Sequence, residues 1–313
     1  AAGNTCGSRP EKEEAAMTPR LTIAVLGTGL LGRAIAARLH TVGHQVVAFN
    51  RTSAKALPLQ REGIAVVGSA DRAVSQADCA LLLLADAAAI REVLFTSSCS
   101  SALKGKTIVQ MGTIAPSESL GIQREVEQRG GGYCEAPVLG SLTEAKAGTL
   151  FVMMGGTGEQ FASWSPLLQS LGREPRHIGP VGAAAALKLA LNHLIAAETS
   201  AFALSLAVVQ RSGIPVETFM GVLRKSALYA PTFDKKLPRL LKRDYEQPNF
   251  STRHLIKDVR LFVHEAEARG LTTEALNGLT WILERTIAKG FGDVDYSALF
   301  EAVNPPAAST PPS

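Results

Sequence analysis

The first half of the chain alternates short apolar runs with amphipathic stretches. Continuous apolar runs of this kind are typical of strands buried on both faces of a parallel sheet, and amphipathic stretches are typical of surface helices. The predicted strands cover residues 21–26, 45–49, 64–67, 78–85, 106–111, 133–138 and 150–154. The helices predicted between them cover residues 86–95, 116–128 and 159–169. This alternation predicts an α/β fold with a doubly wound, mostly parallel sheet.

The longest apolar stretch covers residues 182–210, which are rich in alanine and leucine and contain no proline. Its pattern predicts a long helix buried on most sides. Lys188 and Asn192 stand four residues apart in it, so their side chains share one face. An ammonium in such a helix either reaches the surface or meets a partner, ligand or water, because an isolated buried charge is costly. Both interpretations of Lys188 stay open at this point.

The last third of the chain carries helical patterns without strands. They cover residues 216–225, 253–269 and 271–289, and residues 229–250 are interpreted as a loop. Lys257 and Asp258 stand at the start of the helix at 253–269, where adjacent charges are typical of a solvated face.

A length of 313 residues favours two domains. We predict a disordered leader at 1–18, an α/β domain at 19–180, an all-α C-terminal domain at 181–303 and a disordered tail at 304–313. The long helix joins the two domains. The polar leader does not have the pattern of a secretory signal.

Composition and charge narrow the class of partner. The chain is 46% hydrophobic and 19% charged, and its net charge of +4 is spread thinly, which argues against a nucleic acid. The long apolar helix is interrupted by polar and charged residues, so no membrane partner is expected. The four cysteines and six histidines show no metal-ligand spacing, and we expect no metal and a reducing, cytoplasmic location, with organellar targeting left open.

A glycine-rich turn follows the first predicted strand and precedes an amphipathic stretch. Its residues are Gly27, Thr28, Gly29, Leu30, Leu31 and Gly32. Strand, turn and helix in this order give the dinucleotide-binding pattern G-x-G-x-x-G its required context, so the domain at 19–180 is predicted to be a nucleotide-binding Rossmann-type domain. Gly27 would permit the tight turn, Gly29 the approach of a pyrophosphate, and Gly32 close packing of helix on strand. The helix N-terminus would then offer N–H donors to the phosphates.

The end of the second strand bears on the choice of cofactor. An NAD site usually has an acidic residue here for the ribose 2′-hydroxyl, whereas this chain has Asn50, Arg51 and Thr52. A guanidinium can bind a 2′-phosphate in a bidentate way. The alternative is a solvated surface arginine, but in this context we predict NADP(H).

Ligands of doubly wound sheets bind at the carboxyl ends of the strands. That rule selects residues 84–86, 112–113 and 137–141 as the rim of the site, among them Leu84, Thr113 and Leu139.

Several segments in the right order resemble the β-hydroxyacid dehydrogenases, the family of 3-hydroxyisobutyrate dehydrogenase and the glyoxylate/succinic semialdehyde reductases. The matching segments are IAVLGTGLLGRAIAARL, EAPVLGSLTEAKAGTL, GAAAALKLALN, KDVRL and GDVDYSAL. The resemblance extends from about residue 20 to about residue 303 and implies a site in the cleft between the two domains. It also implies association through the helical part, as a homodimer or homotetramer.

The resemblance also implies roles for individual residues. Lys188 matches the family's catalytic lysine, and Asn192 would orient the substrate. Thr113 and Lys257 match residues near the nicotinamide, and Leu84 lies at a strand end that contacts the nucleotide. A lysine in an apolar cleft can have its pKa lowered toward the working pH, which suits a general acid.

One segment departs from the family pattern. Leu139 stands where the family has a serine that helps to bind the substrate carboxylate. The backbone N–H groups around Gly140, or the hydroxyl of Ser141, would have to compensate; otherwise the substrate is less polar or bulkier than glyoxylate. Glu135 in place of the family's usual aspartate is a milder change.

These observations predict an NADPH-dependent reductase of small carboxylated aldehydes, such as succinic semialdehyde, glyoxylate or, in reverse, 3-hydroxyisobutyrate. One alternative is an imine reductase, which Leu139 favours and Lys188 disfavours. The other is a non-catalytic NADP-binding interaction module, like the family's chromatin-associated member, which lacks the lysine.

Overall fold

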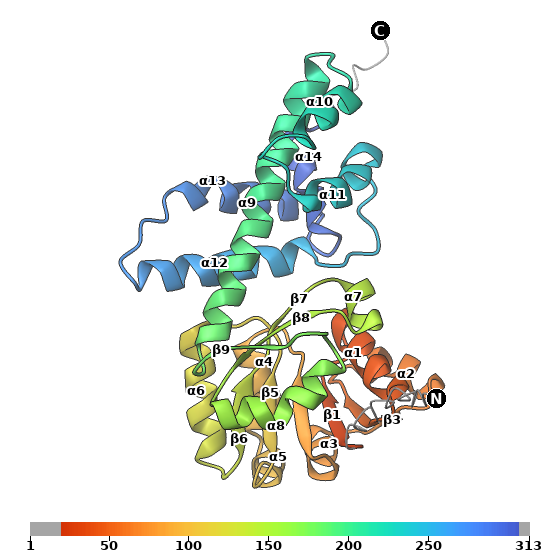
Figure 1. Ribbon diagram of the computed structural model, residues 1–313, viewed down its shortest axis with the longest axis vertical. Coiled ribbons are helices and arrows are strands. Elements are labelled where there is room, and N and C mark those ends of the chain that lie inside the picture. Colours follow the sequence, from red (N-terminus) through yellow and green to blue (C-terminus); the bar gives the residue numbers. More distant parts are fainter. Residues whose placement is uncertain (1–19, 307–313) are drawn as a thin grey trace, which may run out of the picture.

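The computed structural model describes residues 20–306 (Figure 1). The predicted leader at 1–18 and residues 307–313 of the predicted tail lie outside this range. Asn304, which the sequence places in the tail, is buried and bonded: its Oδ1 accepts from Arg211 Nε at 3.0 Å. The ordered chain therefore continues past the predicted boundary.

A nine-stranded sheet forms one half of the molecule, with strand order β3-β2-β1-β4-β5-β6-β8-β7 and β9 beside β8. The pairs from β3 through to β6 are parallel, whereas β8 runs antiparallel to both β6 and β7. The strands are β1 (Thr22–Leu26), β2 (Gln45–Phe49), β3 (Ala65–Val66), β4 (Cys79–Leu82), β5 (Thr107–Gln110), β6 (Gly132–Glu135), β7 (Val138–Leu139), β8 (Phe151–Gly155) and β9 (Arg176–Gly179). The order reverses between β1 and β4, which is where such sheets bind nucleotides.

Helices cover both faces of this sheet (Figure 1). They are α1 (Leu30–Thr41), α2 (Leu57–Arg61), α3 (Ala70–Gln76), α4 (Ala87–Leu94), α5 (Ser97–Ala102), α6 (Pro116–Glu127), α7 (Leu142–Ala147) and α8 (Gly158–Gln169), with a 3₁₀ turn, η1 (Ser53–Lys55). Strand β1 shows how the layers form, because Ile23 and Val25 join the core under α1 and α8, while Ala24 and Leu26 join the core under α3 and α6. All four are fully buried, which explains the continuous apolar run. The predicted doubly wound fold is confirmed.

The second half of the molecule is helical and is built on α9 (Ala183–Arg211). The other elements are α10 (Val216–Leu223), α11 (Pro231–Lys242), α12 (Thr252–Glu267), α13 (Ala275–Ala288), the 3₁₀ turn η2 (Tyr296–Leu299) and α14 (Phe300–Val303). Within residues 20–306, α9 is the one helix long and apolar enough to cross a membrane by length and composition. In this fold it packs against α10 to α14, and near its start against α6, β8 and β9, so it joins the two halves.

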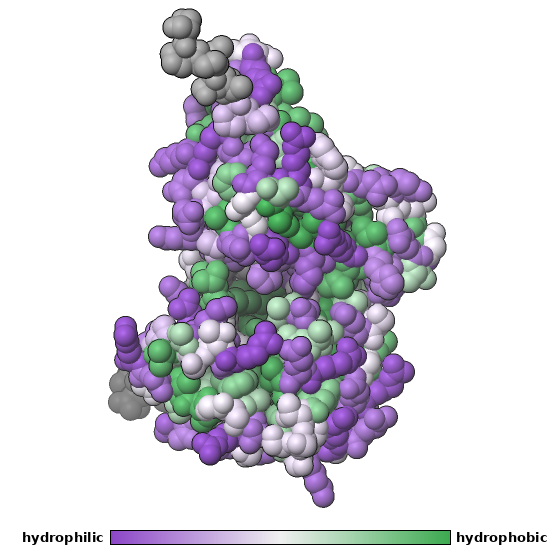
Figure 2. Space-filling model, turned by 180° about the vertical axis from the view of Figure 1, so that it is seen from behind, coloured by the Kyte–Doolittle hydropathy of each residue, from purple (hydrophilic) through white to green (hydrophobic). Residues whose placement is uncertain are grey.

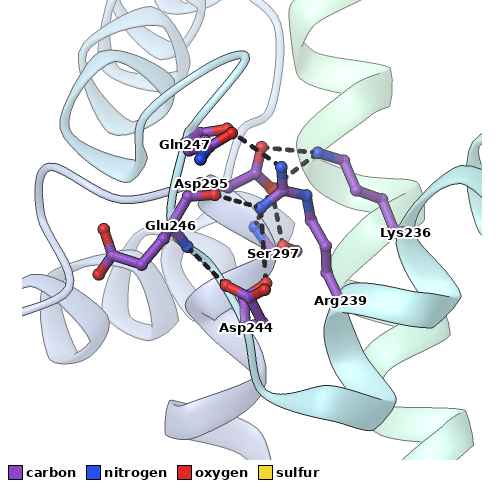
Figure 3. A network of polar contacts seen from close by, with 7 residues as sticks. All are labelled: Lys236, Arg239, Asp244, Glu246, Gln247, Asp295 and Ser297. Carbon is purple, nitrogen blue, oxygen red and sulfur yellow. Dashed lines mark hydrogen bonds and ion pairs between the residues drawn. The ribbon is translucent and has the colours of Figure 1, made fainter.

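A polar network fixes α11 against η2 (Figure 3). The buried Lys236 donates to both carboxylate oxygens of Asp295, at 2.7 and 2.9 Å, and its ammonium lies 4.0 Å from the centre of the Tyr296 ring. Asp295 also accepts from the hydroxyl of Ser297 at 2.7 Å. Arg239, also on α11, donates to the backbone carbonyl groups of Asp244, Glu246 and Gln247. The buried charges of Lys236 and Asp295 are thus compensated by each other, by the Tyr296 ring and by the Ser297 hydroxyl.

The loop predicted at 229–250 is wrong, because it contains α11. Pro231 stands in the first turn, where its missing N–H costs nothing, and Phe233, Leu237 and Leu240 are buried at helical spacing. Pro238 and the run of basic residues concealed this pattern, because a proline inside a helix usually interrupts it.

Other elements differ from the prediction in extent. The strand predicted at 133–138 is two strands, β6 and β7, separated at Ala136 and Pro137, and β3 has only two residues. The pattern also missed α2, α3, α5, α7 and β9, which are short and lack a full period of apolar residues.

Candidate functional site

Each glycine of the turn after β1 has a distinct structural reason. Gly27 has a φ of 103°, and a Cβ there would lie 2.4 Å from the carbonyl oxygen of Leu83. A Cβ on Gly32 would lie 1.9 Å from the carbonyl oxygen of Gly27. A Cβ on Gly29 would meet no atom of residues 20–306 within 4 Å. The first and third glycines therefore allow close packing, and the second leaves the backbone approachable.

The turn leads into α1 with its N–H groups available to an anion. No acidic residue lies in the first turn of α1 and no side chain caps it. Leu30 and Leu31 begin the helix, and Thr28 is buried with its N–H donated to Asn50 Oδ1 at 2.9 Å. The residues fit the pyrophosphate of a dinucleotide, which would be held by the N–H groups at the start of α1.

The end of β2 is tied to the glycine turn through Asn50, whereas Arg51 is exposed and paired with α4. The Oδ1 of Asn50 accepts from the N–H of Thr28, and its Nδ2 donates to the carbonyl oxygen of Thr52 at 2.9 Å. The exposed Arg51 donates from Nη1 to Glu92 Oε2 of α4 at 2.6 Å. Arg51 is therefore an exposed arginine, as one interpretation had it, but it is bound to a carboxylate.

The next part of the rim follows β4 and β5. The buried Gln110 accepts from the N–H of Gly112 at 3.2 Å and donates to its carbonyl oxygen at 3.1 Å. A Cβ on Gly112 would lie 2.7 Å from the carbonyl oxygen of Leu84, so these two strand ends are closely packed. Leu84 also approaches Gly27, 3.1 Å from the position of an added Cβ. This packing brings Leu84 and Thr113 to the same edge as the glycine turn.

Glu135, at the end of β6, anchors the long helix. It is 1% exposed, and its Oε1 accepts from the N–H groups of Gly182 and Ala185 at 2.9 and 3.0 Å. Its Oε2 accepts from the hydroxyl of Ser119. A carboxylate at a helix N-terminus satisfies free N–H groups and stabilises the helix through its macrodipole. The position of α9 is thereby set by the sheet.

Lys188 and Asn192 meet α12 on the shared face of α9. Asn192 is 2% exposed and donates from Nδ2 to Asp258 Oδ2 at 2.6 Å. Its Oδ1 is buried and has no hydrogen-bond partner in the described part of the chain. The Lys188 ammonium likewise makes no hydrogen bond or ion pair within residues 20–306. The cluster thus presents one cation and one acceptor without protein partners.

Lys257 links this cluster to the sheet half. Its Nζ lies 2.6 Å from the carbonyl oxygen of Thr113 and 2.8 Å from Asp258 Oδ1. The solvated face predicted for the pair 257–258 is wrong for Asp258, which is 2% exposed because α12 packs against α9 there. Asp258, which the sequence pattern did not indicate as a site residue, therefore lies close to Lys188, Asn192 and Lys257. Lys257 in turn connects this group to Thr113.

The environment of Lys188 makes its ammonium easier to deprotonate than that of an exposed lysine. Burial lowers the pKa of Lys188 from 10.5 to about 8, the charge of Asp258 opposes this shift, and the charge of Lys257 adds to it. An ammonium with a pKa near the working pH can both give up and regain a proton.

The segment Leu139–Ser141 carries fewer free donors than its sequence suggests. Ser141 directs both its N–H and its hydroxyl to Glu144 Oε2, forming a capping box at the start of α7. These bonds lower the pKa of Glu144 to about 2. Lys235 of α11 reaches Glu144 across the two halves at 3.7 Å. Of the two compensations considered for Leu139, the Ser141 hydroxyl is already used, and the backbone at Gly140 remains.

Sequence reasoning missed Asp258, Gln110 and Glu92 as residues of this region. Asp258 could have been found from the KDVRL segment, which the resemblance already singled out. Gln110 ends an apolar strand and Glu92 lies on an exposed helix face, and neither position has a pattern that distinguishes it.

The space between the two halves is visible from outside. Seen from behind, the surface is hollowed between the sheet half and the helical half, with apolar groups deep in the recess and polar groups around it (Figure 2).

Two family models match nearly the whole described chain. Residues 22–179 match the NAD binding domain of 6-phosphogluconate dehydrogenase, and residues 182–303 match the NAD-binding domain of NADP-dependent 3-hydroxyisobutyrate dehydrogenase.

Named relatives agree with these matches. Glyoxylate/succinic semialdehyde reductase 1 of Arabidopsis thaliana is 28% identical over 285 residues, covering 90% of this chain and 98% of the relative. The 3-hydroxyisobutyrate dehydrogenase of Mycobacterium tuberculosis, solved with L-serine, has a TM-score of 0.81 at 25% identity, covering 91% of this chain and 99% of that one. An imine reductase of Myxococcus stipitatus, solved with NADP⁺, shares the fold with a TM-score of 0.63 at 21% identity, covering 90% and 99%.

The first family model alone covers more than half of the chain, and the second continues directly into the helical half. The glycine turn, the strand order and the long helix agree with both. The chain belongs to the β-hydroxyacid dehydrogenase family of NAD(P)-dependent oxidoreductases.

Proposed function

We propose that this chain is an NADPH-dependent reductase of small carboxylated aldehydes, such as succinic semialdehyde or glyoxylate, with Lys188 as the general acid. The observation that carries the proposal is the Lys188 ammonium, which lies beside Asn192 and Asp258 without a hydrogen-bond partner in the described residues. A charge held in this way is unfavourable for stability, so a functional role accounts for it.

The proposed chemistry follows from the groups around Lys188. Bound NADPH supplies the hydride that the carbonyl carbon of the substrate accepts. Lys188 donates a proton to the carbonyl oxygen as negative charge develops there, and it regains a proton from solvent afterwards. Asn192, held by Asp258 through its Nδ2, offers its free Oδ1 to a substrate hydroxyl or hydrate. In the reverse direction Lys188 acts as the base.

Arg51 supports NADPH as the cofactor. The end of β2 has no acidic residue at 50–52, and the side chain of Asn50 is occupied within the protein. Arg51 is the cationic side chain in 50–52, and a guanidinium suits a 2′-phosphate.

The substrate-facing segment favours a second candidate function as well. With Leu139 apolar and Ser141 bonded to Glu144, a substrate carboxylate would depend on backbone N–H groups near Gly140 and on Lys188. An apolar C=N substrate, as in an imine reductase, needs neither. The free ammonium of Lys188 favours the carbonyl substrate, because an oxygen gaining negative charge benefits more from it.

An apolar groove supports assembly into a homo-oligomer. It has a volume of about 600 Å³ and lies between α9, α12 and α13, lined by residues that include Ala197, Ala201, Leu204 and Phe262. Leu194, Leu204 and Val208 of α9 are each at least half exposed. We propose that a second copy covers this face. Light scattering should give at least a dimer, and a monomer at micromolar concentration would refute this.

NADPH oxidation tests the proposed reaction with succinic semialdehyde, glyoxylate, methylmalonate semialdehyde and a cyclic imine. The proposal expects turnover of a carboxylated aldehyde that collapses in Lys188→Ala. Turnover of the imine alone, unaffected in Lys188→Ala, would favour the second function. Tight NADPH binding without any turnover would favour a non-catalytic cofactor-binding module.

A further inference from the structure

The contact between Arg51 and Glu92 crosses the mouth of the nucleotide crevice. Arg51 follows β2, and Glu92 lies on α4, which follows β4. In the sheet, β1 stands between β2 and β4, and its pairing with β4 marks the point where the strand order reverses. The ion pair therefore connects the two sides of the crevice that binds the adenosine part of a dinucleotide in such sheets.

The geometry of this pair leaves Arg51 only partly engaged. Glu92 accepts from one nitrogen, Nη1, at 2.6 Å, and both side chains are largely exposed, at 77% and 63%. The guanidinium has five N–H donors, so a phosphate can still bind along another edge. A phosphate bound in this way would lie near the Glu92 carboxylate, because Glu92 accepts from Nη1 of the same guanidinium.

We propose that Glu92 is a specificity-determining residue that weakens selection for NADP(H) over NAD(H). The inference rests on the proposed role of Arg51 as the 2′-phosphate ligand. A phosphate dianion is repelled by the Glu92 carboxylate and must share Arg51 with it, whereas a ribose 2′-hydroxyl carries no charge and meets neither penalty. Glu92 therefore lowers affinity for the phosphorylated cofactor alone.

The test is a charge series at one position, measured as the Kd of NADP⁺ and of NAD⁺ by titration calorimetry. The variants are Glu92→Gln and Glu92→Lys, compared with the wild type in 20 mM and 500 mM salt. Because the pair is exposed, we expect a modest gain at low salt, about two- to fivefold tighter NADP⁺ binding for Glu92→Gln and more for Glu92→Lys. NAD⁺ binding should stay within about twofold, and high salt should reduce the gain.

A matched control is available on the same face of the sheet. Arg91 and Glu125 form a similar ion pair at 2.9 Å between α4 and α6, away from β2. Glu125→Gln removes the same charge and should leave the ratio of the two Kd values unchanged.

A second variant separates this inference from the proposed cofactor preference. Arg51→Ala should weaken NADP⁺ binding at least tenfold more than NAD⁺ binding. If it does, and Glu92→Gln leaves NADP⁺ binding unchanged or weaker, the role of Glu92 is refuted while Arg51 keeps its role. If Arg51→Ala leaves the ratio unchanged, the proposed preference itself fails, and the role of Glu92 fails with it.

Discussion

Two lysines in the helical half are withdrawn from solvent in very different ways. Lys236 is bonded to both oxygens of Asp295 and lies against the ring of Tyr296. Lys188 lies near Asp258 but makes no hydrogen bond within residues 20–306. Burial lowers the pKa of both side chains.

The difference indicates how buried charge is used in each place. Around Lys236 the protein supplies the partners itself, which fixes α11 against η2 and leaves nothing for a ligand (Figure 3). Around Lys188 the described residues supply no hydrogen-bond partner, so the charge is available to a substrate. Buried charges of the first kind maintain structure, and those of the second kind are typical of functional sites.

The largest expected effect separates the two lysines by activity. Lys188→Met should lower kcat for aldehyde reduction about 10²- to 10⁴-fold, because the general acid is lost. The free energy of unfolding should not fall, since a methionine fills the space without a charge to desolvate. Steady-state kinetics and urea unfolding of the same preparation measure both. A variant that is inactive only because it is unfolded would contradict this expectation.

The converse effect is expected at the second lysine. Lys236→Met should lower the free energy of unfolding by about 3–5 kcal/mol, because Asp295 would remain buried without its cation. Urea unfolding measures the loss. In Lys236→Met/Asp295→Leu both charges are absent, and part of the stability should return. A single variant as stable as the wild type would remove the contrast between the two sites.

A smaller effect is expected where the two halves meet at Lys188. Asp258→Asn keeps the shape, but it removes the charge that raises the pKa of Lys188 and changes the bond to Asn192. We expect kcat to fall about 10- to 100-fold, as for residues that position a catalytic group. The alkaline limb of the pH–rate profile should also move to lower pH. A lower kcat with an unchanged profile would mean that Asp258 acts on Asn192 alone.

The smallest expected effect is a pH dependence of stability. The folded-state pKa of Lys188, about 8, is below its ordinary value of 10.5. Between these two values the unfolded chain binds the proton and the folded chain does not, so this group makes stability rise with pH. Since the Lys188 side chain is not fully buried and keeps some exposure to solvent, we expect about 1–2 kcal/mol, seen as a difference between wild type and Lys188→Met from pH 8 to 10. Parallel pH curves for the two proteins would contradict it.

Much of the sheet half could be predicted from its sequence, because strands buried on both faces leave long apolar runs. The glycine turn could be predicted equally well, since Gly27 and Gly32 answer a local steric demand and the spacing of all three glycines is a known pattern. Helix α11 was not predictable in the same way, because Pro238 obscures a pattern that only its packing reveals. Short elements such as β9 and α7 depend on contacts with distant segments.

In the candidate site, too, some features follow from the local sequence and others depend on how distant segments pack. Lys188 and Asn192 are neighbours on one helix, so their common face follows from spacing alone. The approach of Asp258 to Asn192 depends on how α12 crosses α9, which no local pattern records. The engagement of Ser141 by Glu144 was readable as a capping box, but its consequence for a substrate required the structure.

Glu135 ties the first turn of α9 to the end of β6, and Lys188 follows six residues after Gly182, roughly 9 Å along the helix. Asn192, one turn further along α9, is bonded to Asp258 of α12. Lys188 thus lies on one helix between an attachment to the sheet and an attachment to the helical half. Any rocking of the two halves that bends α9 would act at the position of the proton donor, so cleft geometry and proton supply are coupled.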